Sequence, residues 1–207
     1  MIDEKIDFIL KNLEKQEIFE RENPTKIPHS EKMLAITRNI GLFYNILLKG
    51  FNTKKILEIG TSVGYSTIWF AESIREKPNS KIITIENDEK KITRAKKNFD
   101  EAGISNLIEI KHGNALDIIP QIQYQYGSES FDFVFIDADK ERYIQYFDTT
   151  FPLVKLGGMI GADNILEPKR FAQFIKPYVE HVRKNPKVLS TTIPIDNGEE
   201  ISIKLRH

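Results

Sequence analysis

The chain has 207 residues, of which 40% are hydrophobic, and this is enough for one compact domain with a single core over residues 1–207. Its 30 basic and 30 acidic residues balance, which argues against a nucleic acid or a membrane surface as partner and favours a small molecule. There are no cysteines, so disulfides, thiolate metal sites and a cysteine nucleophile are excluded.

The first fifty residues predict two helices. Ile2, Ile6, Ile9 and Leu13 recur at helical spacing among charged residues, which indicates an amphipathic helix over about the first twenty positions. A second helix is expected over residues 30–49, with Gly50 as its stop. We expect residues 1–50 to form a cap, an acceptor-binding region or a dimer contact, and residues 51–207 to form a cofactor-binding core.

The start of the chain also bears on location. The segment "MIDEKIDFILKN" places acids among its apolar positions, unlike a secretory signal. No apolar run approaches the roughly 18 residues of a membrane span. We therefore expect a cytoplasmic protein with no membrane partner.

Short runs rich in Ile, Val and Phe then alternate with helical stretches such as "TIWFAESIREK" and "DEKKITRAKKNFDEAG". This alternation predicts an open, mostly parallel α/β sheet with helices on both faces. In the tail, two strand-like runs flank Asp196, Asn197 and Gly198, which predicts a C-terminal antiparallel hairpin. The runs are 55–60, 81–86, 107–113, 131–137, 157–163, 187–195 and 199–205.

In such a sheet, ligands bind beyond the carboxyl ends of the strands, where the strand order reverses. The residues at these ends are therefore the candidate site residues. Most carry side-chain oxygens: Glu58, Gly60, Glu86, Asn114, Ala115, Asp137, Asp163 and Asn164.

The first strand leads into "EIGTSVGYS", which has neither the Lys-Ser/Thr ending of a P-loop nor the glycine triplet of a dinucleotide site. Gly60 permits close approach of the backbone to a ligand, while Glu58 would repel a pyrophosphate and attract an ammonium or sulfonium group. Glu86 ends the second strand, where an acid can bind both hydroxyls of a ribose. The alternatives are an ordinary strand-to-helix turn and a solvated acid.

Asp137, Asp163 and Asn164 supply three hard oxygen ligands from two neighbouring strand ends. This set suits Mg²⁺, which prefers oxygen ligands in octahedral geometry and keeps some positions for water or substrate. Lys140 lies three residues after Asp137 and can face the same crevice as a general base. The alternatives are capping of turns by Asp and Asn, and a solvated surface lysine.

With these positions identified, the chain resembles the cation-dependent O-methyltransferases that use S-adenosylmethionine, the group of catechol and caffeoyl-CoA O-methyltransferases. The resemblance runs from about Ile27 to the C-terminus. It rests on an ordered set of segments: "LEIGTSVGYS", "TIENDEKKITRAKKNF", "GNALDIIP", "FDFVFIDADKERY" and "LVKLGGMIGADNIL".

The resemblance implies a Rossmann-like class I methyltransferase fold with a seven-stranded sheet. It implies S-adenosylmethionine contacts at Ile36, Glu58, Gly60, Thr61, Ser66, Glu86, Ala115 and Asp137. It also implies metal ligands at Asp137, Asp163 and Asn164, with Lys140 and Asp137 as catalytic residues. Asp139 receives no role.

The implied reaction is methylation of one hydroxyl of a small hydroxylated aromatic acceptor with two adjacent hydroxyls, a catechol-like diol, with Mg²⁺ or another divalent cation. The segment "ILEPKRF" departs from plant-type relatives, so their acceptor contacts cannot be transferred to it. Relatives are commonly dimers, and we expect a homodimer. The alternatives are an NAD-dependent oxidoreductase, disfavoured by the missing glycine triplet and by Glu58, and a methyltransferase-like binding module without turnover.

Overall fold

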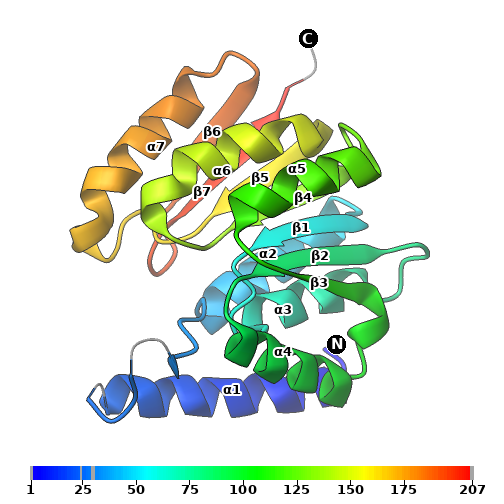
Figure 1. Cartoon of the computed structure of the whole chain (residues 1–207), viewed down its shortest axis with the longest axis vertical. Coiled ribbons are helices and arrows are strands. Elements are labelled where there is room, and N and C mark those ends of the chain that lie inside the picture. Colours follow the sequence, from blue (N-terminus) through cyan, green and yellow to red (C-terminus); the bar gives the residue numbers. More distant parts are fainter. Residues whose placement is uncertain (1, 24, 29–30, 206–207) are drawn as a thin grey trace.

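The computed structural model describes residues 2–23, 25–28 and 31–205. Seven strands form one mixed sheet in the order β3-β2-β1-β4-β5-β7-β6 (Figure 1). The first five are parallel to one another, and β6 and β7 form an antiparallel hairpin whose β7 pairs with β5. The predicted Rossmann-like sheet and hairpin are confirmed. The strands are β1 (Lys55–Ile59), β2 (Lys81–Glu86), β3 (Ile108–His112), β4 (Phe131–Ile136), β5 (Val154–Ala162), β6 (Val188–Ile193) and β7 (Glu199–Lys204).

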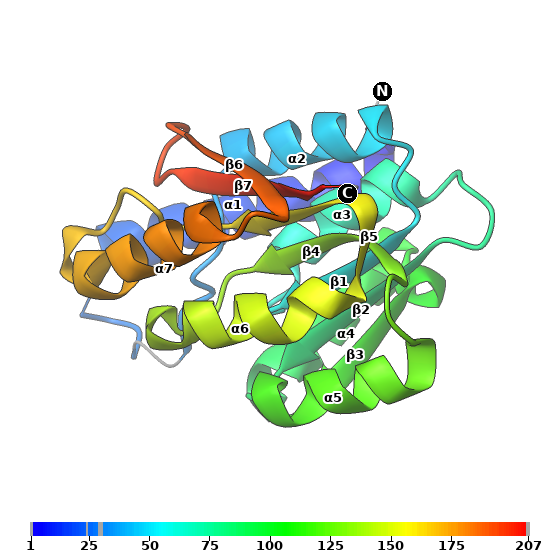
Figure 2. The same ribbon diagram turned by 90° about the horizontal axis from the view of Figure 1, so that it is seen from above.

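Helices cover both faces of the sheet, and Figure 2 shows α2 and α6 on opposite sides of it. One apolar cluster packs helices α1, α2, α3 and α4 against one face of the sheet. A second apolar cluster packs α5, α6 and α7 against the other face. Strand residues alternate between them, because successive side chains of a strand point to opposite faces. The helices are α1 (Glu4–Glu22), α2 (Arg38–Gly50), α3 (Tyr65–Ile74), α4 (Glu89–Ala102), α5 (Ala115–Tyr126), α6 (Tyr143–Thr150) and α7 (Ala172–Lys184).

The order of the strands in the sheet reverses direction between β1 and β4. From β1 the chain runs outward through β2 to β3 and then returns to β4 on the other side of β1. Loops after these two strands diverge to opposite sides and leave a crevice beyond their carboxyl ends. The candidate site residues lie around this crevice.

The N-terminal helix packs on the body of the protein. Ile6, Ile9, Leu10 and Leu13 are buried, and α1 lies against α3 and α4. Within the described residues no helix is both long and apolar enough to cross a membrane.

The prediction of a second helix over residues 30–49 is wrong at its start. Ser30 lies outside the described residues, and α2 begins only at Arg38, after the N-cap Thr37. The preceding segment is held in a non-helical path: Met33 donates its backbone N–H to the buried Glu20 carboxylate at 2.9 Å, and Leu34 has a φ of 46°. Tertiary hydrogen bonds therefore override the local helix preference.

The fifth strand also starts earlier than predicted, at Val154 instead of residue 157. Its pairing with β4 contains an irregularity between Phe131 and Phe133. A bulge of this kind lets the strand continue past Gly157, whose φ is 78°. The carboxyl end of β5, which is followed by Asp163, lies at the position predicted from the sequence.

Candidate active site

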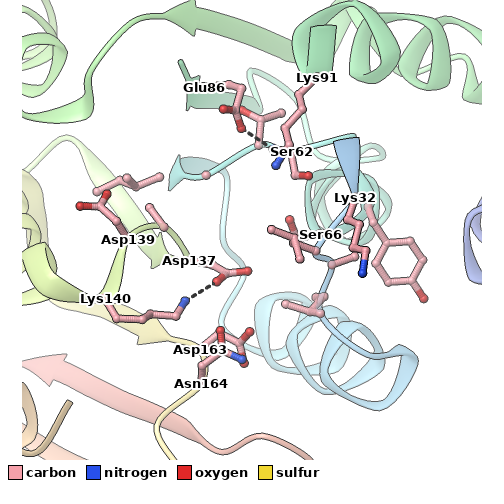
Figure 3. Close-up of a pocket in the computed structure, with 18 of the residues that line it drawn as sticks. Lys32, Ser62, Ser66, Glu86, Lys91, Asp137, Asp139, Lys140, Asp163 and Asn164 are labelled. Atoms are coloured by element: carbon pink, nitrogen blue, oxygen red, sulfur yellow. Dashed lines mark hydrogen bonds and ion pairs between the residues drawn. The ribbon is translucent and has the colours of Figure 1, made fainter. Parts of the chain in front are cut away.

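A cavity of about 690 Å³ opens beyond the carboxyl ends of β1, β2, β4 and β5. Every predicted site residue except Glu58 lines it, so side chains from distant parts of the sequence meet there (Figure 3). The predicted residues in its wall are Ile36, Gly60, Thr61, Ser66, Glu86, Ala115, Asp137, Lys140, Asp163 and Asn164.

Gly60 brings the ends of β1 and β4 together. Its φ is +101°, and a Cβ at this position would lie 1.9 Å from the backbone oxygen of Asp137. The backbone N–H of Asp137 donates to Ile59 at 2.9 Å, which fixes the two strand ends at this separation. Only glycine fits here without moving Asp137.

Glu86 is held in a fixed orientation at the end of β2. One carboxylate oxygen accepts the backbone N–H of Ser62 at 2.7 Å, and the other accepts those of Asn87 and Asp88 at 2.9 and 3.1 Å. Each carboxylate oxygen has two lone pairs, so acceptor capacity remains toward the cavity that Glu86 lines. This arrangement suits a rigid acceptor of ligand hydroxyl groups.

Glu58 lies behind the cavity wall. It is fully buried and accepts hydroxyl hydrogen bonds from Ser66 and Thr67 at 2.5 Å and from Thr84 at 2.6 Å. Burial raises the pKa of its carboxyl group to about 7, although these three hydrogen bonds oppose the shift. Glu58 therefore does not line the cavity; it contacts Ser66, which does.

Ile36 and Ala115 form apolar parts of the wall. Ile36 is buried in the segment before α2, and Ala115 is the first residue of α5. Asn114 lines the cavity as well, but its side-chain oxygen caps α5 by accepting the N–H of Leu116 at 2.9 Å. The Asn114 side chain therefore serves as the N-cap of α5.

Lys140 and Asp137 form an ion pair inside the cavity. Lys140 Nζ lies 2.8 Å from Asp137 Oδ1, and both side chains are largely buried (Figure 3). The amino group also donates to the hydroxyl of Tyr143 at 2.6 Å. Lys140 is therefore a buried residue of the site, and the alternative of a solvated surface lysine is wrong.

Asp163 faces Asp137 from the end of β5. Burial and the nearby Asp137 carboxylate raise the pKa of Asp163 to about 6. Within the described part of the chain its Oδ1 is buried without a hydrogen-bond partner. An orphaned carboxylate oxygen beside a second carboxylate and the Asn164 amide fits a hard divalent cation. Among the described residues, no three Asp, Glu, His or Cys side chains cluster as a metal-binding group; the predicted set has two carboxylates and one amide.

Sequence reasoning missed Glu199, which begins β7 directly behind Asp163. Burial and the neighbouring Asp163 carboxylate raise the pKa of Glu199, and within the described residues its Oε1 is also buried without a hydrogen-bond partner. Tyr44 donates to Glu199 Oε2 at 2.5 Å. The only sequence signal is an acid where the hairpin turns back into the sheet.

Asp139, which received no role from the sequence, also lines the cavity. Its carboxylate accepts a hydrogen bond from Tyr146 and pairs with Arg142 at 3.2 Å. Asp139 therefore anchors the short turn that carries Lys140.

The loop after β5 forms the wall on the far side of Asp163. The backbone N–H groups of Leu166 and Glu167 donate to the carbonyl of Asn197 in the hairpin turn at 2.8 and 3.1 Å. Arg170 lies over the ring of Phe171 at 4.8 Å from its centroid, and both line the cavity. This wall comes from the "ILEPKRF" segment and the hairpin.

Known proteins resemble this chain over most of its length. A family model described as O-methyltransferase matches residues 7–204. The chain is 36% identical over 165 residues to a catechol O-methyltransferase of Niastella koreensis, covering 79% of this chain and 73% of that protein. It is 28% identical over 185 residues to caffeoyl-CoA O-methyltransferase 1 of Eucalyptus globulus, covering 82% and 74%.

Solved structures show the same fold. The O-methyltransferase of Bacillus cereus in complex with SAH superposes with a TM-score of 0.80 at 26% identity, covering 98% of this chain and 91% of that one. TomG of Streptomyces achromogenes, an O-methyltransferase involved in tomaymycin synthesis and solved with SAM, gives 0.80 at 27% identity, covering 100% and 92%. These matches favour a methyltransferase over an NAD-dependent oxidoreductase.

Proposed function

Because this chain belongs to the O-methyltransferase family, we propose that it methylates one hydroxyl of a small aromatic acceptor with two adjacent hydroxyls, with a divalent cation at Asp137, Asp163 and Asn164. Use of S-adenosylmethionine follows from the family and is supported by neighbours solved with SAM or SAH. The observation that carries the finer proposal is the meeting of two carboxylates, an amide and a buried lysine in one cavity.

The cofactor contacts are assigned to the β1 and β2 side of the cavity. Glu86, fixed by three backbone N–H groups, is assigned to the ribose hydroxyls. Gly60, Thr61 and Ser66 form the loop after β1 and are assigned to the methionine portion, while Ile36 and Ala115 supply apolar contact. Glu58 contributes by holding Ser66.

Asp137, Asp163 and Asn164 would hold Mg²⁺ or a similar cation. When bound, such a cation supplies Lewis-acid charge that favours ionisation of a neighbouring hydroxyl and orients the diol. The protein residues contribute fixed positions: Asp163 is buried at a strand end, and Asp137 is tied to β1 by its backbone N–H.

Lys140 is assigned as the base. Its Nζ accepts the proton of the acceptor hydroxyl, the oxygen forms a bond to the methyl carbon, and the carbon–sulfur bond breaks with its electron pair left on sulfur. To accept this proton Lys140 must be neutral, so its ammonium first loses a proton to bulk water. Asp137 orients the amino group by accepting its hydrogen bond at 2.8 Å. Positioning of this kind and proton transfer each contribute large rate factors.

A panel of acceptors tests the proposal. The protein is incubated with S-adenosylmethionine, Mg²⁺ and catechol, caffeic acid or 3,4-dihydroxybenzoate, and products are identified by mass spectrometry. The matched controls, phenol, 4-hydroxycinnamic acid and 4-hydroxybenzoate, lack one of the two hydroxyls. We expect a methyl ether from at least one diol and none from its control. Equal transfer to both would contradict the adjacent-hydroxyl requirement, and no transfer to any diol would contradict the proposed acceptor class.

We also propose a cytoplasmic homodimer, with no nucleic acid as partner. Light scattering coupled to size-exclusion chromatography distinguishes a monomer of this 24.0 kDa chain from a dimer. A single monomeric species across micromolar concentrations would contradict the dimer.

A further inference from the structure

Tyr143 lies directly behind Lys140 and has no established task in the site. It is the first residue of α6 and is fully buried. Its hydroxyl lies 2.6 Å from Lys140 Nζ and 3.1 Å from the backbone oxygen of Asp163. Tyr143 is not among the residues that line the cavity, so it would act on a substrate only through another residue.

The direction of both hydrogen bonds is fixed by chemistry. The Asp163 carbonyl can only accept, so the single hydroxyl hydrogen of Tyr143 points to it. The Lys140 ammonium can only donate, so it donates to the remaining lone pair of that hydroxyl. Lys140 Nζ is 4.8 Å from the centre of the Tyr143 ring, and the much shorter distance to the oxygen identifies the hydroxyl as the contact.

Lys140 is thereby held from two sides. One N–H donates to Asp137 after β4, and a second donates to Tyr143, which is itself tied to Asp163 after β5. A lysine side chain has four rotatable bonds, and its amine would otherwise sample many positions. The two contacts fix the amino group relative to both strand ends and leave its third position for the cavity that Lys140 lines.

We propose that Tyr143 is a positioning residue that holds the Lys140 amino group at the reacting hydroxyl. This inference rests on the proposed function, in which Lys140 receives the acceptor proton. Misplacement of a reacting group by about 1 Å can cost on the order of a hundredfold in rate. Loss of the hydroxyl alone should therefore lower turnover without changing the shape of the cavity.

Tyr178, in the same aromatic cluster, provides a matched control for a purely structural role of the Tyr143 hydroxyl. Tyr178 packs edge-to-face on Tyr143 with ring centres 5.3 Å apart. It is fully buried too, and within the described residues its hydroxyl has no hydrogen-bond partner. Tyr178→Phe thus removes a buried hydroxyl from the same cluster without touching Lys140.

The experiment compares Tyr143→Phe, Tyr178→Phe, Lys140→Ala and the double variant Lys140→Ala/Tyr143→Phe, using the panel diol with the highest turnover. We expect Tyr143→Phe to lower kcat about 10- to 100-fold, with the acceptor KM and S-adenosylmethionine affinity within about twofold of wild type. Tyr178→Phe should keep the wild-type kcat. In the Lys140→Ala background, Tyr143→Phe should cause no further loss, because the two residues act as one unit.

Three results would overturn the inference. A wild-type kcat for Tyr143→Phe, with Lys140→Ala impaired, overturns it alone and leaves the proposed function standing. A loss from Tyr143→Phe that is equally large in the Lys140→Ala background assigns the effect to Asp163 or to the fold. Full turnover by Lys140→Ala removes the base from the proposed mechanism and this inference with it.

Discussion

The contact between Gly60 and Asp137 gives a prediction whose size follows from the geometry. In Gly60→Ala the new methyl group would lie 1.9 Å from the Asp137 backbone oxygen and 2.8 Å from its carbon, at a φ of +101°. The conformation costs about 1 to 2 kcal/mol for a residue with a Cβ, and relief of the overlap costs about 1 to 3 kcal/mol more. We expect a loss of about 2 to 5 kcal/mol in the free energy of unfolding and a Tm lowered by roughly 4 to 20 °C.

The assay is thermal unfolding, with Gly103→Ala as the matched control. Gly103 also has a positive φ, +71°, but nothing lies within 4 Å of its added Cβ, so it should lose only about 1 to 2 kcal/mol. Relief of the overlap in Gly60→Ala requires a shift of residue 60 or of Asp137. Both belong to the proposed site, so methyl transfer should fall as well. A Tm for Gly60→Ala no lower than that of Gly103→Ala would refute the close approach of β1 and β4.

Three further predictions test the rest of the site. Asp163→Ala should abolish cation-dependent transfer and leave S-adenosylmethionine affinity within about threefold by calorimetry; a fully active variant would contradict the ligand assignment. Glu86→Ala should weaken S-adenosylmethionine binding at least tenfold, since a fixed carboxylate acceptor is lost; unchanged affinity would remove Glu86 from the ribose contact. Glu58→Gln should flatten the pH dependence of stability. The pKa of Glu58 is raised to about 7 by burial, so its contribution is fully present below about pH 4.5 and is lost as pH rises through about 7. Between pH 5 and 8, the free energy of unfolding of wild type, measured with urea, should fall by about 2 to 3 kcal/mol more than that of the variant. Parallel pH profiles of the two proteins would show that Glu58 does not ionise in this range.

Most of the sheet could be predicted because each of the five parallel strands is a short, largely apolar segment followed directly by a Gly, Asp or Asn. The same strand ends identify the site, since parallel strands bring their carboxyl ends to one edge. The start of α2 could not be found locally. Its preceding segment is fixed by contacts of Met33 with Glu20 and Ser62, which lie 13 and 29 positions away.

The placement of Glu58 shows a signal that was present but unused. In β1, Ile56 packs into the cluster with α3, and Leu57 packs into the opposite one. By the two-residue alternation of a strand, Glu58 must point to the side of Ile56, where Ser66 of α3 meets it. An acid at a strand end is therefore not always directed at the ligand.

Tyr143 and Glu199 could not be assigned from their positions in the chain. Tyr143 follows Lys140 by three residues, a spacing that allows contact but is common in any helix. Glu199 meets Asp163 only because the C-terminal hairpin inserts β7 beside β5. Such partners become visible only when the sheet order is known.

The cation dependence of methyl transfer tests the central claim most directly. Initial rates are measured with S-adenosylmethionine and the best diol of the panel, first after removal of divalent cations with EDTA and then after Mg²⁺ is restored in excess. Because Asp137, Asp163 and Asn164 are assigned to the cation, we predict that chelation abolishes transfer and that Mg²⁺ restores it, with no restoration in Asp163→Ala. Transfer at the same rate with and without the chelator would contradict this assignment.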